Sequence, residues 1–158
     1  MADVYKVTMV CTGNICRSVM AEYIARDLIE KAGLSDQIEV NSTGTDCWHV
    51  GEGPDGRTIE VLDTLGIDAR GHRSVKIDRA MADEVDLILV ATQKHYDTIK
   101  AMGTATPIRL LREFDPELGS RETLDLADPW FGDMSDFESC LEEVQRSVVH
   151  WLKLHPVT

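Results

Sequence analysis

Residues 10–18 of this chain read Val10-Cys11-Thr12-Gly13-Asn14-Ile15-Cys16-Arg17-Ser18. A run rich in β-branched residues (4–10) precedes it, and apolar residues at helical spacing (20–29) follow it. The pattern predicts a strand, a short loop and a helix in that order. Because parallel sheets bind ligands at the carboxyl ends of their strands, we expect the loop that begins at Cys11 to be a ligand site.

The residue types in this loop suit a tetrahedral anion held against a thiolate. A helix that begins near Arg17 aims unpaired backbone N–H groups at the loop, and such groups bind phosphate oxygens and favour the ionised form of a cysteine. The guanidinium of Arg17 adds a planar fork that matches two of those oxygens. Gly13 and Asn14 tolerate a positive φ, and Ser18 is placed to hydrogen-bond the thiolate. The alternative interpretation is a buried structural cysteine followed by a solvated arginine.

Strand-like and helix-like segments alternate along the rest of the chain. Strands are expected at residues 38–41, 85–90 and 108–111, and helices at residues 59–65 and 95–102. The pattern Ser135-x-x-Glu138 is a capping box that would open a long final helix. The alternation predicts a single α/β domain over residues 1–158 with three layers, in which helices cover both faces of a small parallel sheet.

The longest irregular stretch, residues 112–134, is long enough to be a functional loop, and it contains Asp128-Pro129-Trp130-Phe131-Gly132. If this loop folds over Cys11, Asp128 can protonate a leaving oxygen, and the two aromatic side chains can flank a ring-shaped leaving group. Trp48, in another expected loop, is a third aromatic candidate. Alternatively, the aromatic residues pack on the core. If the loop does not fold over Cys11, Asp46 and Asp125 are the next candidates for the acid.

Composition argues against several classes of function. The chain has 158 residues and a formal net charge of −12, which argues against a nucleic-acid partner, since such surfaces need a basic patch. No apolar run reaches the length of a membrane span, and the N-terminus does not resemble a secretion signal. The four cysteines lack zinc spacing, so we expect free thiols, no metal, no cofactor and a cytoplasmic location, with non-classical export left open. His95, His150 and His155 are expected at the surface or at helix edges.

Together these motifs resemble those of the low-molecular-weight protein tyrosine phosphatases, and the match extends over essentially the whole chain. It rests on the loop at residues 10–18, on Ser42-Thr43-Gly44-Thr45, on Gly-x-x-Pro-Asp-x-Arg at residues 51–57 and on Asp128-Pro129. Residues 48–51 and 133–138 look most like the bacterial branch. The resemblance implies a flavodoxin-like, low-molecular-weight-phosphatase fold with a roughly four-stranded central sheet. It implies a metal-independent enzyme that hydrolyses phosphotyrosine through a phosphocysteine intermediate.

The resemblance also implies a role for each residue of the site. Cys11 would be the nucleophile, Arg17 would bind the phosphoryl oxygens, and Asp128 would protonate the leaving phenolate and then activate water. The other residues of the phosphate loop are Thr12, Gly13, Asn14, Ile15, Cys16 and Ser18. Hydrogen bonds that hold the loop in shape would come from Asn14, Ser18, Ser42 and His72. The pocket for the substrate ring would be lined by Ile15, Trp48, Trp130 and Phe131.

In this family the second cysteine of the loop, Cys16, can form a reversible disulfide with Cys11. The partners implied are phosphotyrosine-containing proteins, with inorganic phosphate or other oxyanions as product or inhibitors. The chain departs from the family at three places. Val19 replaces a frequent proline, Trp130 and Phe131 replace two tyrosines, and Thr92 replaces an aspartate, which leaves the hydrogen bonding around His72 open.

Three alternative functions remain. The phosphate loop of a phosphoarginine phosphatase resembles the loop of this chain, but it carries a threonine at the position of Ile15, and the substrate pocket of that branch is less aromatic. An arsenate reductase on the same loop uses two further cysteines around residues 80–90, and this chain has none between Cys47 and Cys140. A catalytically inactive phosphate-binding module is disfavoured because Cys11, Arg17 and Asp128 are all present.

Overall fold

Four parallel strands form the central sheet of the computed structural model, which describes residues 3–118 and 124–155. The strands are β1 (Tyr5–Cys11), β2 (Ile38–Gly44), β3 (Leu87–Val90) and β4 (Ile108–Leu110), and their spatial order is β2-β1-β3-β4. Strand β1 pairs with β2 on one side and with β3 on the other, both in parallel. The C-terminal end of β1 therefore lies in the interior of the carboxyl edge of the sheet.

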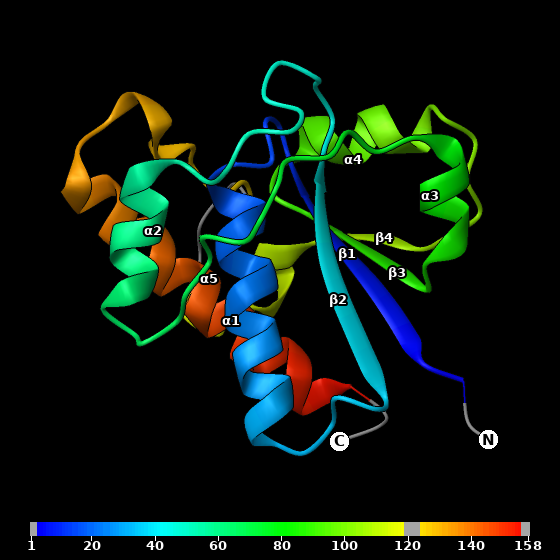
Figure 1. Ribbon diagram of the computed structural model, residues 1–158. Coiled ribbons are helices and arrows are strands. Elements are labelled where there is room, and N and C mark those ends of the chain that lie inside the picture. The colour runs from blue at the N-terminus through cyan, green and yellow to red at the C-terminus, as the bar shows by residue number, and fades with distance from the viewer. Residues whose placement is uncertain (1–2, 119–123, 156–158) are drawn as a thin grey trace.

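Helices cover both faces of the sheet (Figure 1). On one face lie α1 (Arg17–Lys31), α2 (Gly56–Asp63) and α5 (Met134–Leu154), and on the other lie α3 (Arg79–Glu84) and α4 (Gln93–Lys100). Successive strand residues serve opposite faces, as the pleat requires. Val7 and Met9 belong to the core cluster shared with α1 and α5, whereas Val10 belongs to the cluster beneath α4. The three-layer α/β fold predicted from the sequence is confirmed.

One helix was not predicted, and one local prediction is wrong. Helix α3 was not predicted, since it has six residues of which one, Ala82, is buried, too few to show a periodic apolar pattern. The capping box at the start of α5 is formed by Asp133 and Asp136, not by Ser135 and Glu138. The Asp133 carboxylate accepts from the backbone N–H groups of Ser135 and Asp136, which satisfies two donors that a helix leaves unpaired at its start.

The predicted irregular stretch at residues 112–134 contains two short 3-10 helices, η1 (Leu111–Phe114) and η2 (Pro129–Phe131), while residues 119–123 lie outside the described residues. Before η2, the backbone N–H of Leu126 donates to the Ala91 carbonyl just after β3, at 2.8 Å, and the Leu126 side chain is buried. These contacts bring the late loop to the carboxyl edge of the sheet, where β1 ends.

Candidate active site

The loop between β1 and α1 has one residue, Asn14, whose backbone has an unusual conformation. With φ of 57°, Asn14 is the one residue other than glycine that has a positive φ in the described chain. Gly13 could also tolerate a positive φ but does not adopt one. Its missing side chain serves another purpose, because a Cβ on Gly13 would lie 2.9 Å from Cδ2 of His49. The loop thus needs asparagine for its backbone turn and glycine for a close contact.

The side chain and carbonyl of Asn14 hold the loop in place from inside the protein. Asn14 is fully buried, and its Nδ2 donates to Oγ of Ser18 at 2.8 Å and to Oγ of Ser42 at 2.9 Å. Its Oδ1 accepts from the backbone N–H of Val75 at 3.0 Å, and its carbonyl accepts from Nε2 of His72 at 2.8 Å. Ser18, Ser42 and His72 therefore contact the loop as the sequence analysis expected.

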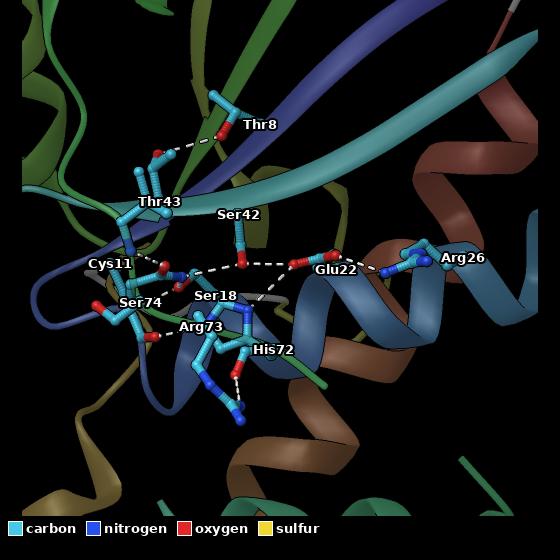
Figure 2. Close-up of polar contacts among 12 residues, drawn as sticks. Thr8, Cys11, Ser18, Glu22, Arg26, Ser42, Thr43, His72, Arg73 and Ser74 are labelled. Carbon is cyan, nitrogen blue, oxygen red and sulfur yellow. Dashed lines mark hydrogen bonds and ion pairs between the residues drawn. The ribbon is translucent and has the colours of Figure 1, made fainter. Parts of the chain in front are cut away.

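A chain of hydrogen bonds beneath the loop connects Glu22 with Cys11 through Ser42, Asn14 and Ser18 (Figure 2). Ser42 donates to Oε1 of the buried Glu22 at 2.6 Å, and Asn14 donates to both serines. Because Ser18 accepts from Asn14, the Ser18 hydroxyl proton is available for Sγ of Cys11, 3.0 Å away. A donor aimed at sulfur favours the thiolate over the thiol.

The sequence analysis missed Glu22, although the chain carried a signal for it. Glu22 follows Ser18 by four residues, so the two lie one turn apart on α1, and Glu22 interrupts the apolar face of the helix between Ala21 and Ile24. Its carboxylate is 3.8 Å from Nδ1 of His72 in addition to its bond with Ser42. Glu22 thus accepts a hydrogen bond from Ser42 and lies near His72, two of the residues that support the loop.

His95 was expected at the surface or at a helix edge; it does lie in the first turn of α4, but it is buried. His95 is 2% exposed, and its Nε2 lies 2.8 Å from Oγ1 of Thr12 in the phosphate loop. Burial, reinforced by the charges of Arg17 and Lys94, lowers the pKa of His95 to about 3. The sequence signal for this arrangement was the spacing of three residues between Thr92, the N-cap of α4, and His95, which is the spacing of a capping box. Thr92, which replaces the aspartate of the family, contacts His95 rather than His72.

Arg17 joins the phosphate loop to the late loop. Its guanidinium donates to the Leu126 carbonyl at 3.0 Å, to Oγ1 of Thr12 at 3.3 Å and to Oδ2 of Asp128 at 3.4 Å. Arg17 is buried, whereas the Asp128 side chain is 36% exposed. Asp128 also caps η2 by accepting from the backbone N–H of Trp130. The acid thus lies at the mouth of the site beside the guanidinium.

The segment at residues 51–57 ties the two loops together. Asp55 caps α2, and its backbone N–H donates to the Ile15 carbonyl at 3.0 Å. Arg57, held by Asp55, donates to the carbonyls of Trp130 and Gly132, both at 3.2 Å. One short motif therefore contacts both the phosphate loop and the loop that carries the acid.

A pocket of about 280 Å³ opens above the phosphate loop. Its lining residues come from the phosphate loop, the loop after β2, α4 and the late loop: Cys11, Thr12, Gly13, Ile15, Cys16, Arg17, Asp46, Trp48, His49, Lys94, Asp128, Trp130 and Phe131. The side chains of Trp48, Trp130 and Phe131 are 78%, 43% and 84% exposed, so they do not pack on the core. They line the open pocket above Cys11.

Of the two other candidate acids, Asp46 lines the pocket but Asp125 does not. Oδ1 of Asp125 accepts from the backbone N–H of Gln93 at 2.8 Å, at the start of α4. Asp128 both lines the pocket and lies 3.4 Å from the Arg17 guanidinium.

All four cysteines are free thiols in the structure, and Cys47 is the exposed one. Burial raises the pKa of Cys16 to about 12, so this thiol next to the site stays protonated at neutral pH. Within residues 3–118 and 124–155, no group of three or more His, Cys, Asp or Glu side chains is placed to hold a metal ion. In the same part of the chain, no helix has the length and apolar character needed to cross a membrane.

Comparisons with known proteins agree with this geometry. The family described as low molecular weight phosphotyrosine protein phosphatase matches residues 6–155. A low molecular weight protein-tyrosine-phosphatase of Streptomyces coelicolor is 39% identical over 145 residues, which are 89% of this chain and 87% of that protein. The structure of YfkJ from Bacillus subtilis matches with a TM-score of 0.87 at 28% identity, over 96% of this chain and 94% of that one. A Drosophila arginine phosphatase matches with a TM-score of 0.84 at 29% identity, over 94% and 96%.

Proposed function

Because this chain belongs to the low molecular weight phosphotyrosine protein phosphatase family and is a protein tyrosine phosphatase, we propose that Cys11, Arg17 and Asp128 carry out its reaction. The observation that carries the proposal is their convergence on one pocket. Ser18 lies 3.0 Å from the Cys11 sulfur, and Arg17 lies 3.4 Å from the Asp128 carboxylate.

In the first step of the proposed reaction, the Cys11 thiolate attacks phosphorus, and the bond between phosphorus and the tyrosine oxygen breaks. Asp128 gives its proton to the departing phenolate, which leaves a phosphocysteine. In the second step, water attacks phosphorus while Asp128 takes the water proton, and the phosphorus–sulfur bond breaks. The products are inorganic phosphate and the restored thiolate, and no metal takes part in either step.

Charge on the transferring phosphoryl group is met by Arg17 and by the backbone N–H groups of the loop at the start of α1. Arg17 is buried and already held by the Leu126 carbonyl, so it needs little rearrangement to bind oxygens. Preorganised donors of this kind stabilise charge that develops in a transition state.

The substrate is a phosphorylated ring in this proposal, since Ile15, Trp48 and Trp130 line the slot above Cys11. Stacking and burial of one ring are worth about 1–3 kcal/mol. A phosphoarginine phosphatase is the second candidate, because an arginine phosphatase is among the structures that match this chain. The aromatic slot and the isoleucine at position 15 favour the ring.

The remaining parts of the proposal concern partners and setting. Inorganic phosphate and other oxyanions should bind as product or inhibitors, and the net charge of −12 disfavours a nucleic-acid partner. We assign residues 1–158 to one phosphatase domain and place it in the cytoplasm. A nucleophilic thiol and three further free thiols suit a reducing compartment.

The test is a panel of peptides phosphorylated on tyrosine, serine or arginine, assayed with a chelator present. Cys11→Ser should abolish turnover because an alcohol is not ionised at neutral pH. Arg17→Lys should lose most of it because a point charge cannot replace the fork. The exposed Cys47→Ser and Arg70→Lys are the matched controls and should retain activity. Turnover by Cys11→Ser near the wild-type rate contradicts the mechanism, and preference for phosphoarginine moves the function to the second candidate.

A further inference from the structure

Thr12 ends a chain of hydrogen bonds that reaches the phosphate loop from α4 and that the proposed reaction does not use. His95, in the first turn of α4, contacts Oγ1 of Thr12 through Nε2 at 2.8 Å, although the two residues are 83 positions apart. The other ring nitrogen of His95 faces Thr92, whose backbone N–H lies 3.2 Å from Nδ1. The ring is therefore held at both ends.

The contact with Thr92 fixes which nitrogen of His95 carries the proton. Nδ1 also lies 3.0 Å from the Thr92 hydroxyl, which can donate or accept. The backbone N–H can only donate, so Nδ1 accepts from it and carries no proton, and the Thr92 hydroxyl donates to the same nitrogen. Nε2 then holds the ring proton and donates it to Oγ1 of Thr12. Burial and the nearby charges of Arg17 and Lys94 lower the pKa of His95 to about 3, so the ring keeps this neutral form at physiological pH.

The hydroxyl of Thr12 accepts two hydrogen bonds, and its proton is not used in either of them. Its oxygen accepts from Nε2–H of His95 and from Nη2–H of Arg17, at 2.8 and 3.3 Å, and a hydroxyl oxygen has two lone pairs. Across the described residues, no acceptor lies within hydrogen-bond distance for the hydroxyl proton of Thr12. Thr12 lines the pocket beside Cys11 and Arg17, so the proton is available to a ligand there.

We propose that Thr12 donates a hydrogen bond to a phosphoryl oxygen of the substrate, and that His95 is a positioning residue that fixes the direction of this bond. The inference rests on the proposed function, because it requires a phosphoryl group beside Arg17. A hydrogen bond to an anionic oxygen is among the strong ones, and a hydroxyl that is already oriented needs no reorganisation when the oxygen arrives.

The first test replaces the hydroxyl and keeps the shape. In Thr12→Val, the inhibition constant of inorganic phosphate should rise, and kcat/KM for para-nitrophenyl phosphate should fall, each by roughly 10- to 100-fold. Thr12→Ser, which keeps the hydroxyl, should recover most of this loss. The matched control is Thr98→Val on the exposed side of α4, whose hydroxyl bonds to the Lys94 carbonyl. A folded Thr12→Val enzyme that binds phosphate like the wild type overturns the proposal.

The second test asks whether His95 acts through Thr12. His95→Phe keeps a ring but has no donor, so it should weaken phosphate inhibition in the wild-type background and have no further effect in Thr12→Val. His95→Gln, whose amide can donate, should recover part of the loss. An equal effect of His95→Phe in both backgrounds contradicts the positioning role.

A measurement on the unmutated enzyme avoids any loss of folding. Nitrogen-15 NMR of the His95 ring at pH 6 should show a neutral ring protonated on Nε2, and a ring protonated on Nδ1 or on both nitrogens overturns the argument. The outcomes are separable from those of the proposed function. Turnover by Cys11→Ser near the wild-type rate refutes the mechanism itself, whereas an unaffected Thr12→Val beside an inactive Cys11→Ser refutes only the role of Thr12.

Discussion

Replacing Asn14 by alanine should lower the free energy of unfolding by about 4 kcal/mol. The substitution removes three side-chain hydrogen bonds, to Ser18, Ser42 and the backbone of Val75. Each is worth about 1 kcal/mol net in a protein interior. Alanine must also keep the φ of 57°, and the left-handed conformation costs an ordinary L-residue about 1–2 kcal/mol, more than it costs asparagine. Three lost hydrogen bonds contribute about 3 kcal/mol and the strain about 1 kcal/mol more, which gives the expected loss of about 4 kcal/mol.

Asn14→Gly separates the two contributions. Glycine loses the same three hydrogen bonds but adopts a positive φ without strain. Its more flexible unfolded chain offsets about 0.4–1 kcal/mol of that advantage. Asn14→Gly should therefore be more stable than Asn14→Ala by roughly 0.5–1 kcal/mol.

The assay is urea unfolding of the wild type and both variants, compared at equal m-values. The matched control is Asn41→Ala, at an exposed position of β2, which should change stability by less than about 0.5 kcal/mol. Turnover of para-nitrophenyl phosphate should fall in both Asn14 variants, since the Ser18 proton is no longer directed at Cys11. Two results refute the reasoning: an Asn14→Ala protein within 1 kcal/mol of the wild type, or one more stable than Asn14→Gly.

Three further predictions follow from the site and the core. Asp128→Ala should lose about 10²–10⁴-fold in kcat/KM on a phosphotyrosine peptide and much less on an aryl phosphate with a better leaving group. Because kcat/KM reports the first step and not hydrolysis of the phosphocysteine, equal losses in kcat/KM contradict the role of Asp128 as acid. Burial would raise the pKa of Asp115, but hydrogen bonds from Arg146 and neighbouring donors outweigh it and hold this pKa below the ordinary value. The Asp115 carboxylate therefore stabilises the fold above about pH 4, and this contribution is lost as the pH falls through the lowered pKa. In urea unfolding, Asp115→Asn should be less stable than the wild type by about 3 kcal/mol at pH 7 and by less at pH 3. Peroxide should convert Cys11 to a sulfenate, which Cys16 captures as a disulfide with loss of water. After a dithiol is added, Cys16→Ser should therefore regain less activity than the wild type, whereas equal recovery assigns Cys16 to packing.

Short-range patterns in the sequence were sufficient to predict the elements that build the site. A strand of alternating apolar residues, the loop that begins at Cys11 and the helix after it are encoded within about thirty neighbouring residues, where spacing follows directly from strand and helix geometry. The same holds for the sheet, since repeated alternation of strands and helices leaves few arrangements other than a parallel sheet covered on both faces. The chemical types of Cys11, Arg17 and Asp128 likewise indicated phosphoryl chemistry before their positions were known.

Tertiary structure alone decided which of these residues meet and in what state. Arg17 and Asp128 are 111 positions apart, and His95 and Thr12 are 83 apart, so nothing local in the sequence places either pair in contact. The helix-edge position expected for His95 gave no sign that the residue is buried, because burial depends on what packs around a residue, not on its own type. The same packing removes water from His95, keeps its ring neutral and aims its proton at the phosphate loop. Protonation and hydrogen-bond direction follow from desolvation and neighbouring charges, and both exist only once distant segments of the chain have come together.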